Sequence, residues 1–200
     1  MIKLNRTTII VIPFIVFATN AYSKNISYDY VQATYSSITD SGLGFDVDGD
    51  GFAVSGSFSV TPNIAVGALF GSTSYDDIFG VTVDATELNF GLVAHTSVSP
   101  GTDIFGSFSV VNAEVELSDG FNTLTDDDTG NAIGAGIRSM ISDKVEVNVA
   151  LARVDIFDDS ATDFGLGARF YVDQKISLGV AYVTGDDVDT LLLSARLDLK

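Results

Sequence analysis

The sequence is 200 residues long, with 27 acidic residues, 10 basic residues and no cysteine. Its formal charge of -17 at pH 7 argues against nucleic acid as a partner, because phosphates are bound by Lys and Arg. The absence of cysteine excludes a disulfide scaffold and a lipid-anchored lipoprotein. The mean hydropathy is nevertheless positive, at +0.31, so apolar and charged residues must be segregated along the chain.

The first 23 residues have the features of a secretory signal peptide. Lys3 and Arg6 precede the apolar run "TTIIVIPFIVFA", and Ala21 and Ser23 follow it at A-x-A-like positions. The run is shorter than the roughly 20 residues that a membrane-spanning helix needs. We expect cleavage after Ser23, with Ala21 as the second choice, and one exported domain over residues 24–200.

A motif that resembles the start of a calcium loop follows the first expected strand. Asp46, Asp48 and Asp50 stand at alternate positions before Gly51. A complete helical calcium loop also needs a carboxylate at its twelfth position, and that position is occupied by Ser57. We therefore assign no metal site. The three aspartates are retained as a tentative cation loop, with a solvated acidic loop as the favoured interpretation.

The rest of the chain alternates apolar and small residues with a period of two, which is typical of strands with two unlike faces. In "GFAVSGSFSV", for example, Phe52 and Val54 share one face while Ala53 and Ser55 share the other. The pattern predicts ten strands, with eight as the alternative. Their expected ranges are 26–37, 51–60, 64–75, 83–98, 103–117, 130–141, 145–156, 163–172, 176–184 and 190–199.

The fifth of these strands changes its apolar face between Phe108 and Val111, which we interpret as a β-bulge. The connections also follow a rule along the chain. Those after even-numbered strands are short, such as "TPN" and "SPGT", whereas those after odd-numbered strands are longer and rich in Asp. All short turns would then lie at one end and all acidic loops at the other.

These features together predict an all-β fold, an antiparallel up-and-down transmembrane β-barrel with short periplasmic turns and long acidic extracellular loops. A closed barrel satisfies every backbone hydrogen bond in lipid, where an open sheet edge would not. A secreted soluble β-domain is the alternative. Because the sequence has no Trp, aromatic residues at the membrane interfaces must be Tyr and Phe. The candidates are Tyr35, Tyr75, Phe105, Phe170, Tyr171 and Tyr182.

The chain resembles the small bacterial outer-membrane β-barrel proteins, the OmpA-transmembrane-like and opacity-like porins, and most of all a ten-stranded group. The resemblance rests on the opening "YDYVQATY" and on hairpins such as "GFAVSGSFSVTPNIAVGALFG" and "FGLGARFYVDQKISLGVAYVTGD". It implies an outer-membrane location and no assured activity. The partners to expect are outer-membrane lipid and lipopolysaccharide, and periplasmic chaperones and the barrel-assembly machinery during biogenesis. Divalent cations at the acidic loops are a further candidate.

Five charged residues fall on the small-residue face of their strands and are expected in the barrel interior: Glu87, Arg138, Glu146, Arg169 and Arg196. Enclosed charges must be paired or hydrated. They form either an ion-pair network that plugs the lumen, which we favour, or a constriction that selects ions or small solutes.

His95, the only histidine, has no recognisable Ser or Asp partner motif, so we assign it a structural role and name no catalytic residue or cofactor. The sequence therefore predicts a non-enzymatic envelope protein with a structural or surface-interaction role through its acidic loops. A narrow porin-like channel is the alternative.

Overall fold

The computed structural model describes residues 19–21, 24–42 and 44–199, and side chains from Tyr28 onward. Most of the expected signal peptide lies outside these residues, and its cleavage stays a prediction. Two short strands, β1 (Thr19–Ala21) and β2 (Lys24–Ser27), pair into a separate two-stranded sheet. Within the residues that the structure describes, no helix is long and apolar enough to cross a membrane.

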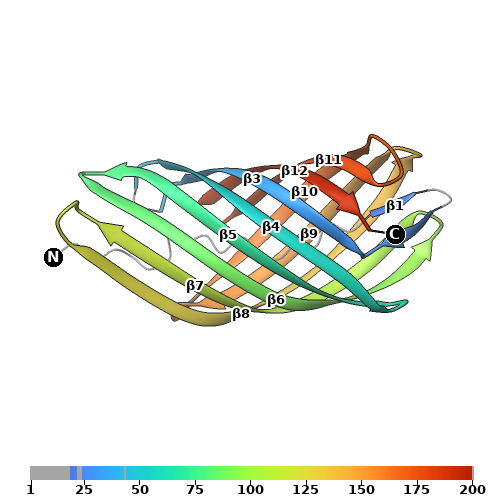
Figure 1. Ribbon diagram of the computed structural model, residues 1–200, viewed down its shortest axis with the longest axis horizontal. Coiled ribbons are helices and arrows are strands. Elements are labelled where there is room, and N and C mark those ends of the chain that lie inside the picture. Colours follow the sequence, from blue (N-terminus) through green and yellow to red (C-terminus); the bar gives the residue numbers. More distant parts are fainter. Residues whose placement is uncertain (1–18, 22–23, 43, 200) are drawn as a thin grey trace.

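The ten expected strands all form, and they close into one antiparallel barrel (Figure 1). Each strand pairs with its neighbours in the sequence, and β12 pairs with β3 to close the sheet. The strands are β3 (Tyr30–Asp40), β4 (Val47–Thr61), β5 (Ile64–Ile78), β6 (Val81–Ser99), β7 (Thr102–Ser118), β8 (Thr123–Ser142), β9 (Val145–Ile156), β10 (Asp159–Tyr171), β11 (Ile176–Gly185) and β12 (Val188–Asp198).

The connections are short at both ends of the barrel, and the ends differ in how far the strands extend beyond the apolar band. We call the end with connections 62–63, 100–101, 143–144 and 172–175 the turn end, and the opposite end the hairpin end. The prediction of long loops at the hairpin end is wrong. Three of its connections have only two residues each, 79–80, 157–158 and 186–187, and the longest connection is residues 41–46. The strands themselves continue through the expected loops, because β hydrogen bonding between β5, β6, β7 and β8 extends almost to the tips.

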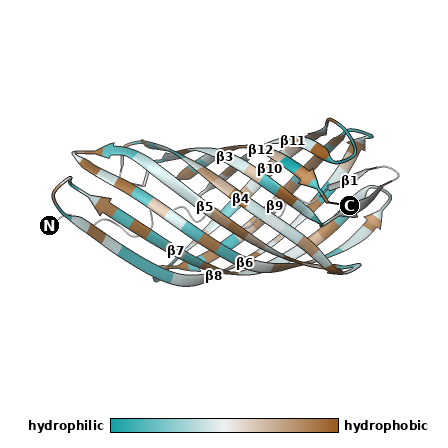
Figure 2. Ribbon diagram, in the orientation of Figure 1, coloured by the Kyte–Doolittle hydropathy of each residue, from teal (hydrophilic) through white to brown (hydrophobic). Residues whose placement is uncertain are grey.

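Apolar side chains cover the outside of the barrel and small residues fill the inside, as the alternation predicts. Phe52, Phe90, Leu166 and Leu193 are 66%, 58%, 48% and 49% exposed, whereas Ala53 on the opposite face is 6% exposed. Figure 2 shows this alternation as hydrophobic and hydrophilic residues in turn along the strands. A barrel of this polarity places its apolar surface against lipid.

Polarity reverses toward the hairpin end, most clearly on β7. On the outward face, Phe108 and Val110 give way to Asn112 and Glu114. On the inward face the apolar residues begin at the same level, since Val111 is fully buried and packs in an apolar cluster at this end. The bulge predicted between Phe108 and Val111 is therefore wrong. The ladders from β7 to β6 and β8 run without a register shift there, and the two faces exchange character because the strand leaves the apolar band.

The longest strands extend well beyond that band. β8 has 20 residues, which at about 3.3 Å per residue and a tilt of about 40° rise roughly 50 Å, about twice the ~25 Å apolar band of a membrane barrel. The hairpins β5–β6 and β7–β8 accordingly project furthest at one end of the molecule in Figure 1. We call this projecting part of β5, β6, β7 and β8 the outer wall.

Not all of the expected interfacial aromatic residues face outward. Tyr35, Phe170 and Tyr182 are 36%, 49% and 39% exposed on the outer face. Phe105 and Tyr171 are buried inside the barrel, and Tyr75 shares the inward face of β5 with buried Thr73. These three assignments are wrong.

Candidate functional site

A cluster of charged and aromatic side chains fills the lumen at the turn end. It draws on six strands and on the segment before β3, and every member is less than 9% exposed. We call it the turn-end cluster: Tyr28, Tyr30, Asp103, Arg138, Glu146, Arg169, Tyr171, Arg196 and Asp198.

Arg138 and Glu146 form the central ion pair of this cluster. Arg138 Nη2 lies 3.3 Å from Glu146 Oε1, and both side chains are at most 2% exposed. The other oxygen of Glu146 accepts a hydrogen bond from Tyr171, at 3.4 Å. Arg138 also donates to the hydroxyl of Tyr28, at 3.4 Å, and that hydroxyl donates to Asp103, at 3.3 Å. The pair is thus the centre of a connected polar network, which is the condition for burying charge without a large penalty.

The other two arginines have different partners. Arg196 Nη2 lies 2.7 Å from Asp198 Oδ1, and its guanidinium carbon lies 3.9 Å from the centre of the Tyr30 ring, within the range of a cation–π contact. Arg169 donates to neutral acceptors: Gln32 at 2.7 Å, Ser177 at 3.3 Å and Ser194 at 3.4 Å. These contacts link β10, β11, β12 and β3 across the closure of the barrel.

The five interior residues selected from the sequence are all buried, but they do not form one group. Arg138, Glu146, Arg169 and Arg196 meet in the turn-end cluster. Glu87 lies elsewhere: it is level with Ala113 of β7, whereas Arg138 is level with Asp103 and Ser97. Its neighbour on β5 is Gly71, where an added Cβ would lie 3.1 Å from Glu87 Cγ.

His95 borders the turn-end cluster. Its ring stacks on Tyr28 with 3.5 Å between ring centres, and its Nδ1 lies 4.0 Å from Asp103 Oδ2. The other oxygen of Asp103 accepts a hydrogen bond from Ser97, at 2.7 Å. The serine hydroxyl therefore points to the carboxylate and not to the imidazole, which is the geometry of a packed polar network.

Two carboxylates of the cluster, Asp103 and Asp198, were missed in the sequence. Asp103 stands beside the turn at residues 100–101, where an aspartate reads as ordinary turn chemistry, and Asp198 is the last residue of β12. The period-two rule could have found them, because Asp198 shares the face of Arg196 two residues away and Asp103 shares the face of Phe105. Which arginine meets which acid depends on the ladder registers, and those are not visible in the sequence.

Only one residue of the tentative cation loop lies in a connection between strands: Asp46, at the end of residues 41–46. Asp48 and Asp50 lie on β4, on the same outward face as Phe52 and directly above it. Asp48 Oδ1 accepts a hydrogen bond from Thr39, at 2.8 Å. Side chains at alternate strand positions form a row about 6.6 Å apart, not a cage. Over the part of the chain that the structure covers, no three acidic, histidine or cysteine side chains are grouped to hold a metal ion.

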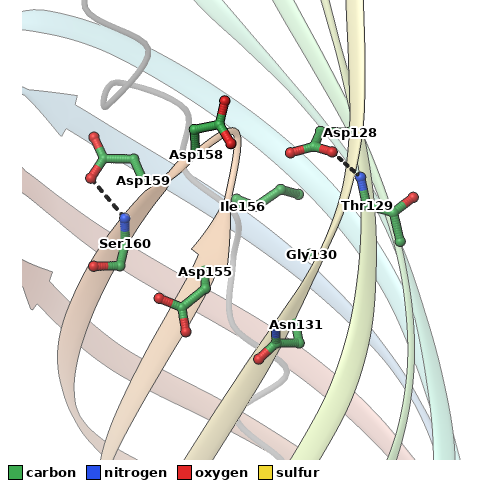
Figure 3. Close-up of a pocket in the computed structure, with 9 residues that line it drawn as sticks. All are labelled: Asp128, Thr129, Gly130, Asn131, Asp155, Ile156, Asp158, Asp159 and Ser160. Atoms are coloured by element: carbon green, nitrogen blue, oxygen red, sulfur yellow. Dashed lines mark hydrogen bonds between the residues drawn. The ribbon is translucent and has the colours of Figure 1, made fainter.

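A second polar site lies at the hairpin end, in a cleft of about 530 Å³ between β8 and the β9–β10 hairpin (Figure 3). Four aspartates line this acidic cleft: Asp128, Asp155, Asp158 and Asp159. Asp128 accepts a hydrogen bond from the backbone N–H of Phe157, at 2.6 Å, and Asp155 pairs with half-exposed Arg153, at 3.2 Å. The cleft carries an excess of negative charge and faces solvent.

Comparison with known proteins agrees with this architecture. Residues 9–190 match the family model described as "Outer membrane protein beta-barrel domain". Among solved structures, the chain is similar to the β domain of the Bordetella autotransporter BrkA, with 14% identity, a TM-score of 0.51 and coverage of 86% of this chain and 99% of that one. It is also similar to the Neisserial surface protein A (NspA), with 10% identity, a TM-score of 0.50 and coverage of 86% and 98%. At these identities the two structures show the fold alone. No curated protein matches the sequence.

Proposed function

Because the chain belongs to the family of outer membrane β-barrel domains, we propose that it is a non-enzymatic barrel with a closed lumen, and that its role is a surface interaction made by the outer wall. The chain lies in the outer membrane, as the family does. The hairpin end would face outside the cell, since short turns are typical of the periplasmic end of such barrels.

The height of the outer wall carries this proposal. A barrel that served only as a membrane component would need about 10 residues per strand, yet β6, β7 and β8 have 19, 17 and 20. The extra length is built as a water-exposed sheet, with Asp84, Glu114 and Glu116 on its outer face and an apolar cluster beneath. We take this ordered, water-exposed sheet as the surface that contacts a partner outside the cell.

The turn-end cluster supports the closed state. Arg138 and Arg196 are each paired with an acid, and Arg169 is hydrogen-bonded to neutral groups. Arg138, Glu146, Arg169 and Arg196 are each at most 3% exposed. A selective constriction would instead leave charged groups along a hydrated path. The row formed by Asp48 and Asp50 would lie at the level of lipopolysaccharide head groups, where divalent cations could bridge the like charges.

Planar-bilayer conductance of the refolded protein tests the closed state. The wild type should produce no unitary steps. A variant that lacks both charges of the central pair, Arg138→Ala with Glu146→Ala, shows whether the assay detects an opened lumen. Stable steps from the wild type would contradict the proposal and support a narrow channel for small solutes or ions.

A further inference from the structure

β8 continues past the end of its neighbour β9. The β8–β9 ladder ends where Asn131 pairs with Asp155, but β8 begins at Thr123 and pairs with β7 along that whole stretch. Among the strands that the structure describes, β8 therefore has a neighbour on one side only over residues 123–129. We call this backbone segment the β8 edge.

The point where β9 ends, and so stops pairing with β8, is fixed by local contacts. Gly130 allows the backbone of Asp155 and Ile156 to approach closely, since an added Cβ would lie 2.7 Å from Ile156 Cβ. Directly after this contact, Phe157 and Asp158 take left-handed conformations, with φ of 55° and 60°, and turn the chain into β10. The bond from the Phe157 N–H to Asp128 fixes the turn. β9 thus stops at a defined point and leaves the β8 edge uncovered.

Natural sheets protect their edges against unwanted pairing with charged side chains, especially lysine, and with proline, bulges or short strands. The three aspartates of the β8 edge give such protection against another acidic or uncharged strand, but not against a cationic one. The β8 edge reads "TLTDDDT", without lysine or proline, and its ladder with β7 has no register shift. It is also exposed, and Leu124 on it is 65% exposed and neighbouring Phe121 is 96% exposed. The edge offers backbone hydrogen-bonding groups, apolar side chains and negative charge in one extended line.

The charge of this region selects the occupant. A second copy of the chain added at the same edge would bring its Asp126, Asp127 and Asp128 against the same three residues, which like-charge repulsion opposes. A strand that carries lysine or arginine would instead be attracted by these three aspartates. It would also be attracted by the acidic cleft, which begins at Asp128, at the C-terminal end of the β8 edge (Figure 3). The cleft, of about 530 Å³, is large enough for a basic side chain.

We propose that the β8 edge binds a cationic, extended segment of a partner protein by strand addition, with a basic side chain of that segment in the acidic cleft. The added strand pairs with β8 beyond the end of β9, so that it extends the sheet of the outer wall, and it covers Leu124 and Phe121. The proposal deepens the surface role proposed above and rests on it in one respect, that the hairpin end faces outside.

A fluorescent peptide of alternating lysine and valine tests the proposal with the full-length protein in zwitterionic detergent micelles. We expect saturable binding by fluorescence anisotropy. The variant Asp127→Lys with Asp159→Lys should weaken binding by roughly tenfold or more, because it reverses charge at the edge and in the cleft. The matched control, Asp48→Lys with Asp76→Lys, makes the same change at exposed sites on β4 and β5 and should bind nearly as the wild type does. Heat-modifiability on a gel verifies that each variant is folded.

Peptides that are N-methylated at alternate residues separate strand addition from simple charge attraction. They keep every charge but lose the backbone donors of one strand side, so the version methylated on the pairing side should fail to bind. Equal binding of all peptides, equal loss in both double variants, or no binding by the wild type would each overturn the proposal. Peptide binding to the purified protein but not to intact cells would instead contradict the outward orientation and leave the strand addition intact.

Discussion

Phe105 of β7 and Gly136 of β8 are direct partners in the barrel ladder, and the ring of Phe105 occupies the space that a side chain at position 136 would need. An added Cβ there would lie 2.5 Å from Phe105 Cζ and 2.6 Å from the carbonyl oxygen of Val149. The small residues of the inward face are thus the counterpart of the few large side chains that fill the lumen.

Replacing Gly136 by alanine should therefore lower the free energy of unfolding by about 1–3 kcal/mol, the usual range for overpacking. Gly106 is the control, because it lies on the outward face, where an added Cβ meets only the Gly134 carbonyl oxygen at 3.8 Å. Urea unfolding in detergent measures both. Equal stability of Gly136→Ala and Gly106→Ala would mean that the lumen is loosely packed.

The central ion pair gives the second prediction. Arg138→Ala leaves Glu146 buried without its cation, so the free energy of unfolding should fall by about 3–5 kcal/mol. The exposed pair of Arg153 and Asp155, with side chains 50% and 45% exposed, is the control, and Arg153→Ala should cost about 0–1 kcal/mol. Similar losses in the two variants would show that water reaches the turn-end cluster.

The period-two pattern predicted all ten strands, because the direction of a side chain depends only on its position within its own strand. The inward charges Arg138, Glu146, Arg169 and Arg196 follow from the same rule, as does the outward face of Phe52 and Phe90.

The predictions that failed are those that depend on how far along the barrel axis a residue lies, and not on whether its side chain points inward or outward. The exchange of polarity between Phe108 and Val111 looks like a bulge, because a sequence read alone does not mark where an apolar band ends. The Asp-rich segments likewise looked like loops, although cross-strand pairing holds Asp126 and Asp127 in β8. Cross-strand partners, such as Glu146 for Arg138 and Gln32 for Arg169, depend on ladder registers that a sequence does not show. Asp103 and Asp198 were missed for another reason, because they lie at strand ends, although the period-two rule places both on the inward face.

The third prediction concerns the apolar band. Phe108 lies on the outward face within the band, so Phe108→Arg should cost about 2–4 kcal/mol, as charge near the middle of a bilayer does. Glu114 has the same orientation on the same strand but lies above the band, and Glu114→Arg should leave the stability almost unchanged. Unfolding in lipid vesicles provides the comparison. If Glu114→Arg lowered the free energy of unfolding as much as Phe108→Arg does, the apolar band would extend beyond Glu114, contrary to the polarity of β7.

The tip of the β7–β8 hairpin gives a prediction of pH dependence. The carboxylate of Asp119 accepts hydrogen bonds from the N–H groups of Asn122 and Phe121, at 2.7 and 2.9 Å, and these lower its pKa below the usual value. Because the pKa is lower in the folded tip, the stabilisation is fully present above the ordinary aspartate pKa and is lost as the pH falls through the folded value.

Hydrogen exchange at the Phe121 and Asn122 amides should therefore show more protection near neutral pH than expected for an exposed turn. Asp119→Ala should remove this protection at every pH. An unchanged exchange rate in that variant would mean that the carboxylate does not order the tip.

The reversal of polarity along β7 underlies both the outer wall and the strand edge, and single-cysteine scanning tests it most directly. The natural sequence has no cysteine, so one spin label can be placed at each position from 108 to 116 in lipid vesicles. Collision with oxygen, which concentrates in lipid, should dominate at Phe108 and Val110, and collision with a water-soluble nickel complex at Asn112, Glu114 and Glu116. The odd positions between them should be shielded from both. Lipid contact that continued through Glu116, or water contact at Val111 and Ala113, would contradict the account.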